Sequence, residues 1–146
     1  MSEDCEDRAA RISRSFEAQG LMRTLGARLA WVGEGEVHIA MPNSPAVSQQ
    51  QGFVHAGAIT SIVDSACGYA ALSLAAPGFE VVSAEFKINL MRPAIGTHFL
   101  AVGKVQNAGR LLTVCSGEVR AFLSEDARDF KVVALMQATM VLVQAR

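Results

Sequence analysis

The sequence lacks several features that would mark a specialised class of protein. Only 18% of its 146 residues are charged, and 13 basic against 14 acidic side chains give a net charge of −1. No basic surface for nucleic acid is therefore expected. No apolar run approaches 18 residues, so no transmembrane helix and no membrane partner are predicted. The acidic start, MSEDCEDRAAR, has no apolar segment of the kind that a secretory signal needs.

Cysteines are few as well, and their spacing is uninformative. Cys5, Cys67 and Cys115 form no CxxC pair and no metal-binding pattern. We therefore predict free thiols, no metal site and a reducing, cytoplasmic setting. No basic group stands at a spacing that would activate Cys67 as a nucleophile.

Apolar residues, by contrast, are plentiful. They make up 51% of the chain, and the mean hydropathy is +0.27, which is high for a small globular protein. We expect one domain over residues 1–146 whose surplus apolar surface forms an interface in a homo-oligomer.

Periodicity predicts two helices and about six strands. A 3.6-residue pattern indicates an amphipathic helix over 3–19, within an N-terminal segment 1–20, and the Ala-rich stretch from Gly52 to Ala75 indicates a long apolar helix. Runs separated by turn residues predict a hairpin and then four strands that pair as a meander: 21–32, 36–41, 82–90, 98–106, 111–123 and 130–143. One long helix with about six strands predicts an α+β fold, a curved antiparallel sheet wrapped around that helix.

The long helix carries two titratable residues, His55 and Asp64. They are nine positions apart, so they point to roughly opposite sides and lie about 13 Å apart along the axis. They cannot form an acid–base pair within one helix. If both serve one site, one of them must come from a second copy of the chain, as a two-fold dimer with antiparallel helices would allow.

The start of this helix predicts a site for a polarised carbonyl. Its unpaired N–H groups belong to about His55, Ala56, Gly57 and Ala58, and small side chains there let an oxygen come close. Such groups can hold an oxyanion, while a partly desolvated carboxylate opposite acts as general base or as nucleophile. These parts suffice for ester or thioester hydrolysis without a metal.

Structural roles explain the same residues differently. A carboxylate among apolar neighbours is costly unless it is exposed, paired or functional, so Asp64 is either a catalytic residue or an exposed or paired structural one. A lone His55 is more often a helix cap or a structural residue. Tyr69 is expected in the core or in an interface rather than in a site.

Two stretches of the sequence resemble the hotdog-fold acyl-CoA thioesterases of the phenylacetic-acid-degradation type. They are GFVHAGAITSIVDSACGYAAL (52–72) and VVSAEFKINLMRPA (81–94). Gly52, His55, Gly57 and Asp64 match the family's G-x-x-H-G-G motif and its following Asp, and Met91-Arg92-Pro93-Ala94 matches the end of a later strand. The resemblance covers about residues 21–143 and implies a hotdog fold.

This resemblance implies a role for each matching position. Ala56 replaces the first motif glycine and would polarise the substrate carbonyl through its N–H, and Gln49 replaces an Asn that places water or substrate. Asp64 of the other protomer would activate water or attack directly. Gly57 and Ser83 would line the substrate site, while Arg92 and Arg110 would meet the nucleotide of coenzyme A. Coenzyme A enters as part of the substrate, no further cofactor is implied, and family members are commonly dimers of dimers.

The expected function is hydrolysis of a small to medium or aromatic acyl-CoA, as in phenylacetic acid degradation. Because Ala56 and Gln49 depart from the family pattern, a non-catalytic acyl-CoA-binding module is the main alternative. A hotdog enoyl-CoA hydratase is a weaker one, since the Pro-Gly near the His that such enzymes carry is missing.

Overall fold

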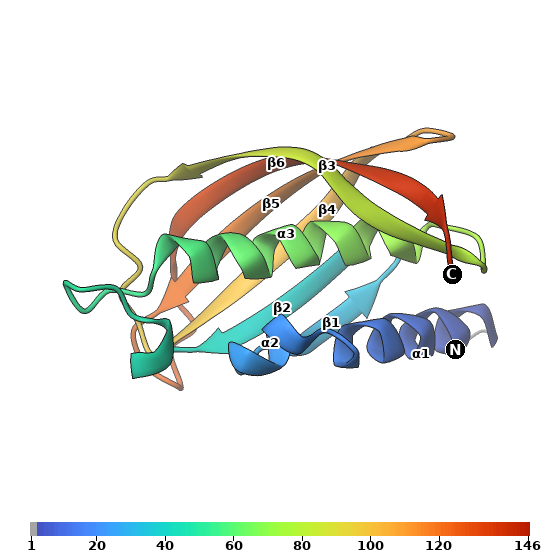
Figure 1. The fold of residues 1–146 in the computed structure, drawn as a ribbon. Helices are drawn as coiled ribbons and strands as arrows, with labels where there is room; N and C mark the ends of the chain where they lie inside the picture. Colours follow the sequence, from blue (N-terminus) through green and yellow to red (C-terminus); the bar gives the residue numbers. More distant parts are fainter. Residues whose placement is uncertain (1–2) are drawn as a thin grey trace.

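The computed structural model describes residues 3–146, which form one curved antiparallel sheet around a long helix (Figure 1). The sheet order is β1-β2-β4-β5-β6-β3. This arrangement confirms the predicted α+β architecture with six strands. The strands are β1 (Arg28–Gly33), β2 (Glu36–Pro42), β3 (Phe79–Leu90), β4 (His98–Ala108), β5 (Leu112–Phe122) and β6 (Lys131–Gln144).

The central helix, α3 (Ala56–Ser73), lies in the hollow of the sheet because two glycines let it approach the backbone. Gly103 and Gly117 are paired across β4 and β5. A Cβ at Gly103 would come within 2.4 Å of the Ala66 carbonyl carbon, and one at Gly117 within 2.5 Å of a Val63 methyl. These residues therefore fix how deeply α3 packs, and Ile62, Val63, Ala66 and Cys67 are fully or almost fully buried there.

The position of β3 corrects the predicted meander. β4, β5 and β6 do follow one another, but β3 pairs with β6 at the far edge of the sheet and does not touch β4. The reason is that α3 crosses the hollow between β2 and β3, so the chain re-enters the sheet on the opposite side. Residues 91–97 then return it to the middle of the sheet.

The prediction of a single strand over 21–32 is also wrong. A short helix, α2 (Gly20–Thr24), comes first, and β1 starts only at Arg28. Met22 is buried and Leu25 packs on the core, a three-residue spacing that suits a helix rather than a strand. Gly26, with φ of +68°, turns the chain between the two elements.

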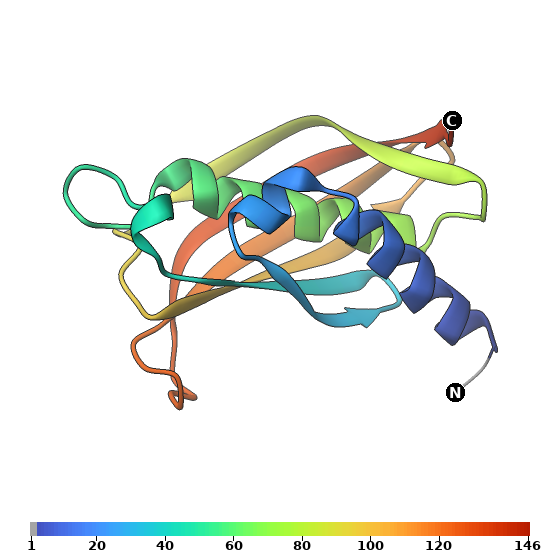
Figure 2. The same ribbon diagram turned by 60° about the horizontal axis from the view of Figure 1, so that its bottom comes forward.

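The N-terminal helix α1 (Glu3–Glu17) lies over β1 and α3 (Figure 2). The helix predicted over 3–19 is thus present, two residues shorter, while residues 1 and 2 of the segment 1–20 lie outside the described part. Arg8 donates to the Ser73 carbonyl at 3.0 Å, and Arg11 donates to those of Leu72 and Ala75 at 3.1 and 2.9 Å. Two cations therefore satisfy the carbonyl end of α3, where the helix dipole is negative.

None of the helices in residues 3–146 is long and apolar enough to cross a bilayer.

Candidate active site

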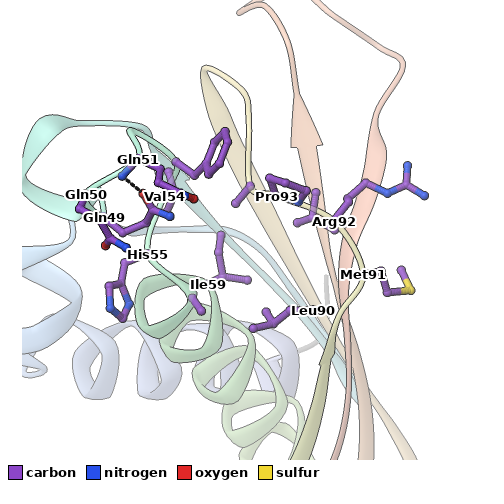
Figure 3. Close-up of a pocket in the computed structure, with 14 residues that line it drawn as sticks. Gln49, Gln50, Gln51, Val54, His55, Ile59, Leu90, Met91, Arg92 and Pro93 are labelled. Atoms are coloured by element: carbon purple, nitrogen blue, oxygen red, sulfur yellow. Dashed lines mark hydrogen bonds between the residues drawn. The ribbon is translucent and has the colours of Figure 1, made fainter.

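A cleft of about 610 Å³ opens at the N-terminal end of α3 (Figure 3). Its walls come from the loop before the helix, from the first turns of α3 and from the end of β3 with the residues after it. The cleft brings together four predicted site residues, Gln49, His55, Ala56 and Arg92. The other lining residues are Gln50, Gln51, Phe53, Val54, Ile59, Leu90, Met91, Pro93, Ala94 and Val133.

The first turn of α3 leaves one backbone donor for a ligand. His55 is the N-cap, and its Nδ1 accepts from the Gly57 N–H at 2.7 Å. The Ala58 N–H donates to the His55 carbonyl, and the His55 N–H donates to the Val47 carbonyl. No acceptor in residues 3–146 bonds the Ala56 N–H. Of the four predicted donors, Ala56 alone is therefore available, and its residue lines the cleft.

The same geometry gives His55 and Gly57 a structural function. A Cβ on Gly57 would lie 2.9 Å from the His55 Nδ1, so a side chain there would push the capping ring away. Gly57 thus serves the cap, and its own N–H is already used by His55.

Gln49 is held in place by its own loop. The Gln51 N–H donates to the Gln49 side-chain oxygen, as the dashed line in Figure 3 marks. The Gln49 N–H donates to the Phe53 carbonyl at 2.8 Å. With its oxygen engaged, the Gln49 amide retains its Nε2 group as a donor at the wall of the cleft.

The two arginines occupy different places. Arg92 lines the cleft, but its exposed side chain extends away from the helix start in Figure 3. Arg110 lies in the β4–β5 connection, at the opposite end of α3 in Figure 1, and does not line the cleft. Within one chain, therefore, only Arg92 is near Ala56.

Asp64 belongs to a second, smaller cavity of about 240 Å³. Its carboxylate is half-buried and accepts a hydrogen bond from the Ser83 hydroxyl at 2.7 Å. Ser83 lies on β3 just before a bulge, and both residues line this cavity. The hydrogen bond fixes one carboxylate oxygen, and the other has no hydrogen-bond partner within residues 3–146.

The cleft and the smaller cavity share no lining residue. Asp64 follows Ala56 by eight positions, which is about 12 Å along the helix axis. One chain consequently holds the unpaired Ala56 N–H and the Asp64 carboxylate in two separate places.

The buried thiols take no part in either cavity. Cys67 and Cys115 are fully buried, and burial raises the pKa of Cys67 well above its ordinary range and that of Cys115 to about 11. Both thiols therefore stay protonated at neutral pH and are poor nucleophiles. Residues 3–146 contain no group of three or more His, Cys, Asp or Glu side chains that could hold a metal ion.

Sequence reasoning missed the residues around Asp64. Ser15, Gln19 and Glu80 line the smaller cavity, and Tyr69, which lies in the core as expected, lines it as well. The one local signal was Gly68, since a glycine inside a helix costs about 1 kcal/mol relative to alanine.

Comparison with known proteins identifies the family of this chain. The family model described as the thioesterase superfamily matches residues 51–122. A thioesterase family protein from Silicibacter pomeroyi is 38% identical, with 94% of this chain and 99% of that chain covered and a TM-score of 0.90. Comparison with curated proteins gave no match.

Two more distant structures share the fold. The PaaI protein from the phenylacetic acid degradation operon of E. coli is 20% identical, with coverage of 95% and 96% and a TM-score of 0.82. The thioesterase HI1161 of Haemophilus influenzae is 18% identical, with coverage of 92% and 90% and a TM-score of 0.80. They confirm the hotdog fold. The 38% identical protein from Silicibacter pomeroyi, together with the family-model match, establishes that this chain belongs to the thioesterase superfamily and is a thioester hydrolase.

Proposed function

We propose that the protein hydrolyses acyl-CoA thioesters at a site built from two copies of the chain. One copy supplies the Ala56 N–H and the other supplies Asp64. The observation that carries this proposal is the separation of the two groups, which lie in different cavities about 12 Å apart along one helix. A thioester carbonyl cannot touch both within one protomer.

The bare edge of the sheet supports such an assembly. β3 is an edge strand, and Ser83, Phe86 and Leu90 pair with buried residues of β6, so they point to the α3 side of the sheet. Even so, Phe86 is 42% exposed and Leu90 is 52% exposed. Pairing this edge with that of a second copy would cover both side chains and bring two α3 helices together.

In this arrangement the thioester oxygen accepts hydrogen bonds from the Ala56 N–H and from Gln49 Nε2. Both donors line the same cleft, and neither has an acceptor among the described residues. They polarise the carbonyl, and they stabilise the negative charge that develops on its oxygen during attack.

Asp64 of the other copy then activates water. Its free carboxylate oxygen takes a proton as the water oxygen bonds to the carbonyl carbon, the C–S bond breaks, and the proton passes to the leaving thiolate. The products are a carboxylic acid and the free thiol of coenzyme A. In the alternative route Asp64 attacks directly, and the resulting anhydride is hydrolysed. Oxygen-18 from water appearing in the Asp64 carboxylate during a single turnover distinguishes the second route from the first.

The substrate is proposed to be a small to medium or aromatic acyl-CoA. The larger cleft, with exposed Arg92 at its wall, suits the pantetheine arm and a phosphate. Arg110 would contribute only if assembly brought it close. The PaaI protein, which is encoded in the phenylacetic acid degradation operon, shares the fold. An aromatic acyl-CoA is therefore the first substrate to test. The dimer of dimers and the cytoplasmic location remain predictions.

The decisive test combines two inactive variants. Asp64→Asn removes the base, and Ala56→Pro removes the N–H at a helix position that accepts proline. Each homo-oligomer should release thiol from acyl-CoAs at least about a hundredfold more slowly than wild type. A doubly tagged mixed dimer has one site with both changes and one intact site, so it should regain about half of the wild-type activity.

If the mixed dimer stays as inactive as its parents, the site lies within one chain. If wild type releases no thiol from short, long or aromatic acyl-CoAs, the proposed substrate class is wrong.

A further inference from the structure

The cavity beside Asp64 has features that the hydrolytic chemistry does not use. It lies between α3, the edge strand β3 and the α1–α2 segment, and seven of its ten lining residues have polar side chains. We infer, on the basis of the proposed function, that this cavity binds the acyl group and selects short acyl chains that end in an uncharged hydrogen-bonding group. The lining residues are Ser15, Gln19, Asp64, Ser65, Gly68, Tyr69, Glu80, Val81, Ser83 and Met140.

The size of the cavity limits what can enter it. Its volume is about 240 Å³, below the range of about 300–1,000 Å³ that is typical of whole small-molecule sites. It can therefore take a part of an acyl-CoA and not the whole molecule. Since Asp64 must face the thioester carbon, the part that reaches further in is the acyl chain.

Gly68 gives the chain its path along α3. Asp64, Ser65, Gly68 and Tyr69 have the spacing of residues on one helix face. Tyr69 lies about 7.5 Å beyond Asp64 along the axis. A Cβ on Gly68 would meet only a Val81 methyl, at 3.8 Å, so alanine fits without strain and would project into this path.

The far wall is a polar group formed by Ser15 of α1, Gln19 just before α2 and Tyr69 of α3. Gln19 Nε2 donates to the Tyr69 hydroxyl at 2.7 Å, and the Ser15 hydroxyl lies 3.2 Å from the same oxygen. Tyr69 is only 5% exposed. The Ser15 and Tyr69 hydroxyls share one hydrogen bond, in which only one of them is the donor. The proton of the other hydroxyl therefore remains available to a ligand, whichever of the two donates. The oxygen of the Gln19 amide has no donor among the described residues.

Charge in the cavity discriminates against acidic acyl groups. Asp64 and Glu80 both line it, whereas none of its lining residues is Lys, Arg or His. A carboxylate at the end of the acyl chain would therefore lose water without gaining a cation, which is costly. A hydroxyl at the same position would instead accept or donate one hydrogen bond at the far wall.

Three acyl-CoAs of equal chain length test this inference: hexanoyl-CoA, its terminally hydroxylated analogue and adipoyl-CoA. We expect wild type to hydrolyse the hydroxylated substrate with a kcat/KM about two- to tenfold above that of hexanoyl-CoA. Adipoyl-CoA should be at least about tenfold worse than hexanoyl-CoA. Tyr69→Phe should bring the ratio of hydroxylated to plain substrate close to one, and Glu80→Gln should raise the relative rate for adipoyl-CoA.

Ser15→Ala and Ser13→Ala form a matched pair on α1. Ser15 lines the cavity, whereas Ser13 bonds only Glu17. Ser15→Ala should lower the preference for the hydroxylated substrate, and Ser13→Ala should not. Gly68→Ala should keep the fold and reduce hydrolysis of all three substrates relative to acetyl-CoA.

Equal rates for the plain and hydroxylated substrates, or an unchanged ratio in Tyr69→Phe, would overturn the inference and leave the proposed function standing. No effect of Gly68→Ala on the acetyl-to-hexanoyl ratio would do the same, and this variant decides the question if Tyr69→Phe fails to fold. Absence of hydrolysis of any acyl-CoA by wild type would overturn the proposed function and the inference together.

Discussion

The first turn of α3 and its third turn contribute to the proposed reaction in different ways. At the first turn the available group is a backbone N–H, that of Ala56, and the neighbouring His55 side chain acts on the helix itself. At the third turn the available group is a side chain, Asp64, and Ser83 on another element positions it. The first turn therefore depends on backbone geometry, and the third depends on residue identity.

This difference explains why we expect Ala56 to be compatible with activity although it departs from the family glycine. Alanine supplies the same N–H, and position 56 does not require a glycine, because none of the non-glycine residues in 3–146, Ala56 included, has a positive φ. No comparable tolerance is expected at Asp64, where the carboxylate itself does the chemistry.

Position 56 gives the sharpest test of this comparison. We expect Ala56→Pro to lower kcat by about 10²–10³-fold, the effect of removing one oxyanion donor. His55 is extended, with ψ of 138°, which suits a residue before proline. Ala56→Gly keeps the N–H and is the matched control, so its kcat should stay within a few-fold of wild type. Equal losses in both variants would mean that the methyl group of Ala56, not its N–H, matters.

Position 83 tests the third turn with a smaller effect. Ser83→Ala removes the hydrogen bond to Asp64 and should lower kcat by about three- to tenfold, with little change in KM. Ser83→Thr retains a hydroxyl and should recover most of the rate. A rise in KM with unchanged kcat would indicate that Ser83 contacts the substrate instead of positioning Asp64.

The smallest effect is expected at the cap. His55→Ala should destabilise the protein by about 1 kcal/mol, because the Gly57 N–H loses its acceptor. His55→Asn offers another capping side chain and should restore most of that stability. Urea denaturation followed by circular dichroism measures both. A large loss of activity in His55→Asn with normal stability would assign a chemical role to His55.

Much of the fold was predictable because its signals are local. The Ala-rich stretch of α3 and the alternating residues of β3 specify their own secondary structure. The place of β3 was not predictable from such signals, because strand pairing depends on contacts far apart in the sequence. The helix at residues 20–24 was missed for a related reason. The spacing of Met22 and Leu25 indicates a helix only when the core against which they pack is known.

In the candidate site, too, some residues have a local sequence signal and others depend on contacts between distant segments. Asp64 and Ala56 stand out through a helix pattern and a motif. That Ala56 is the one free donor follows only from the partners of its neighbours, His55, Gly57 and Ala58. Ser15 reaches the cavity from α1 and Gln19 from the start of α2, and nothing in the local sequence connects them with Tyr69.

The glycine pair beneath α3 has a consequence for engineering. Because Gly103 and Gly117 seat the helix directly on strand backbone, it cannot tilt or sink without a steric clash. Ala56 and Asp64 therefore shift only as one rigid piece, and a side chain added at Gly103 would displace both at once. Redesign of substrate range is better directed at single cavity residues outside α3, such as Ser15 and Gln19, because α1 as a whole also holds the C-terminal carbonyls of α3 through Arg8 and Arg11.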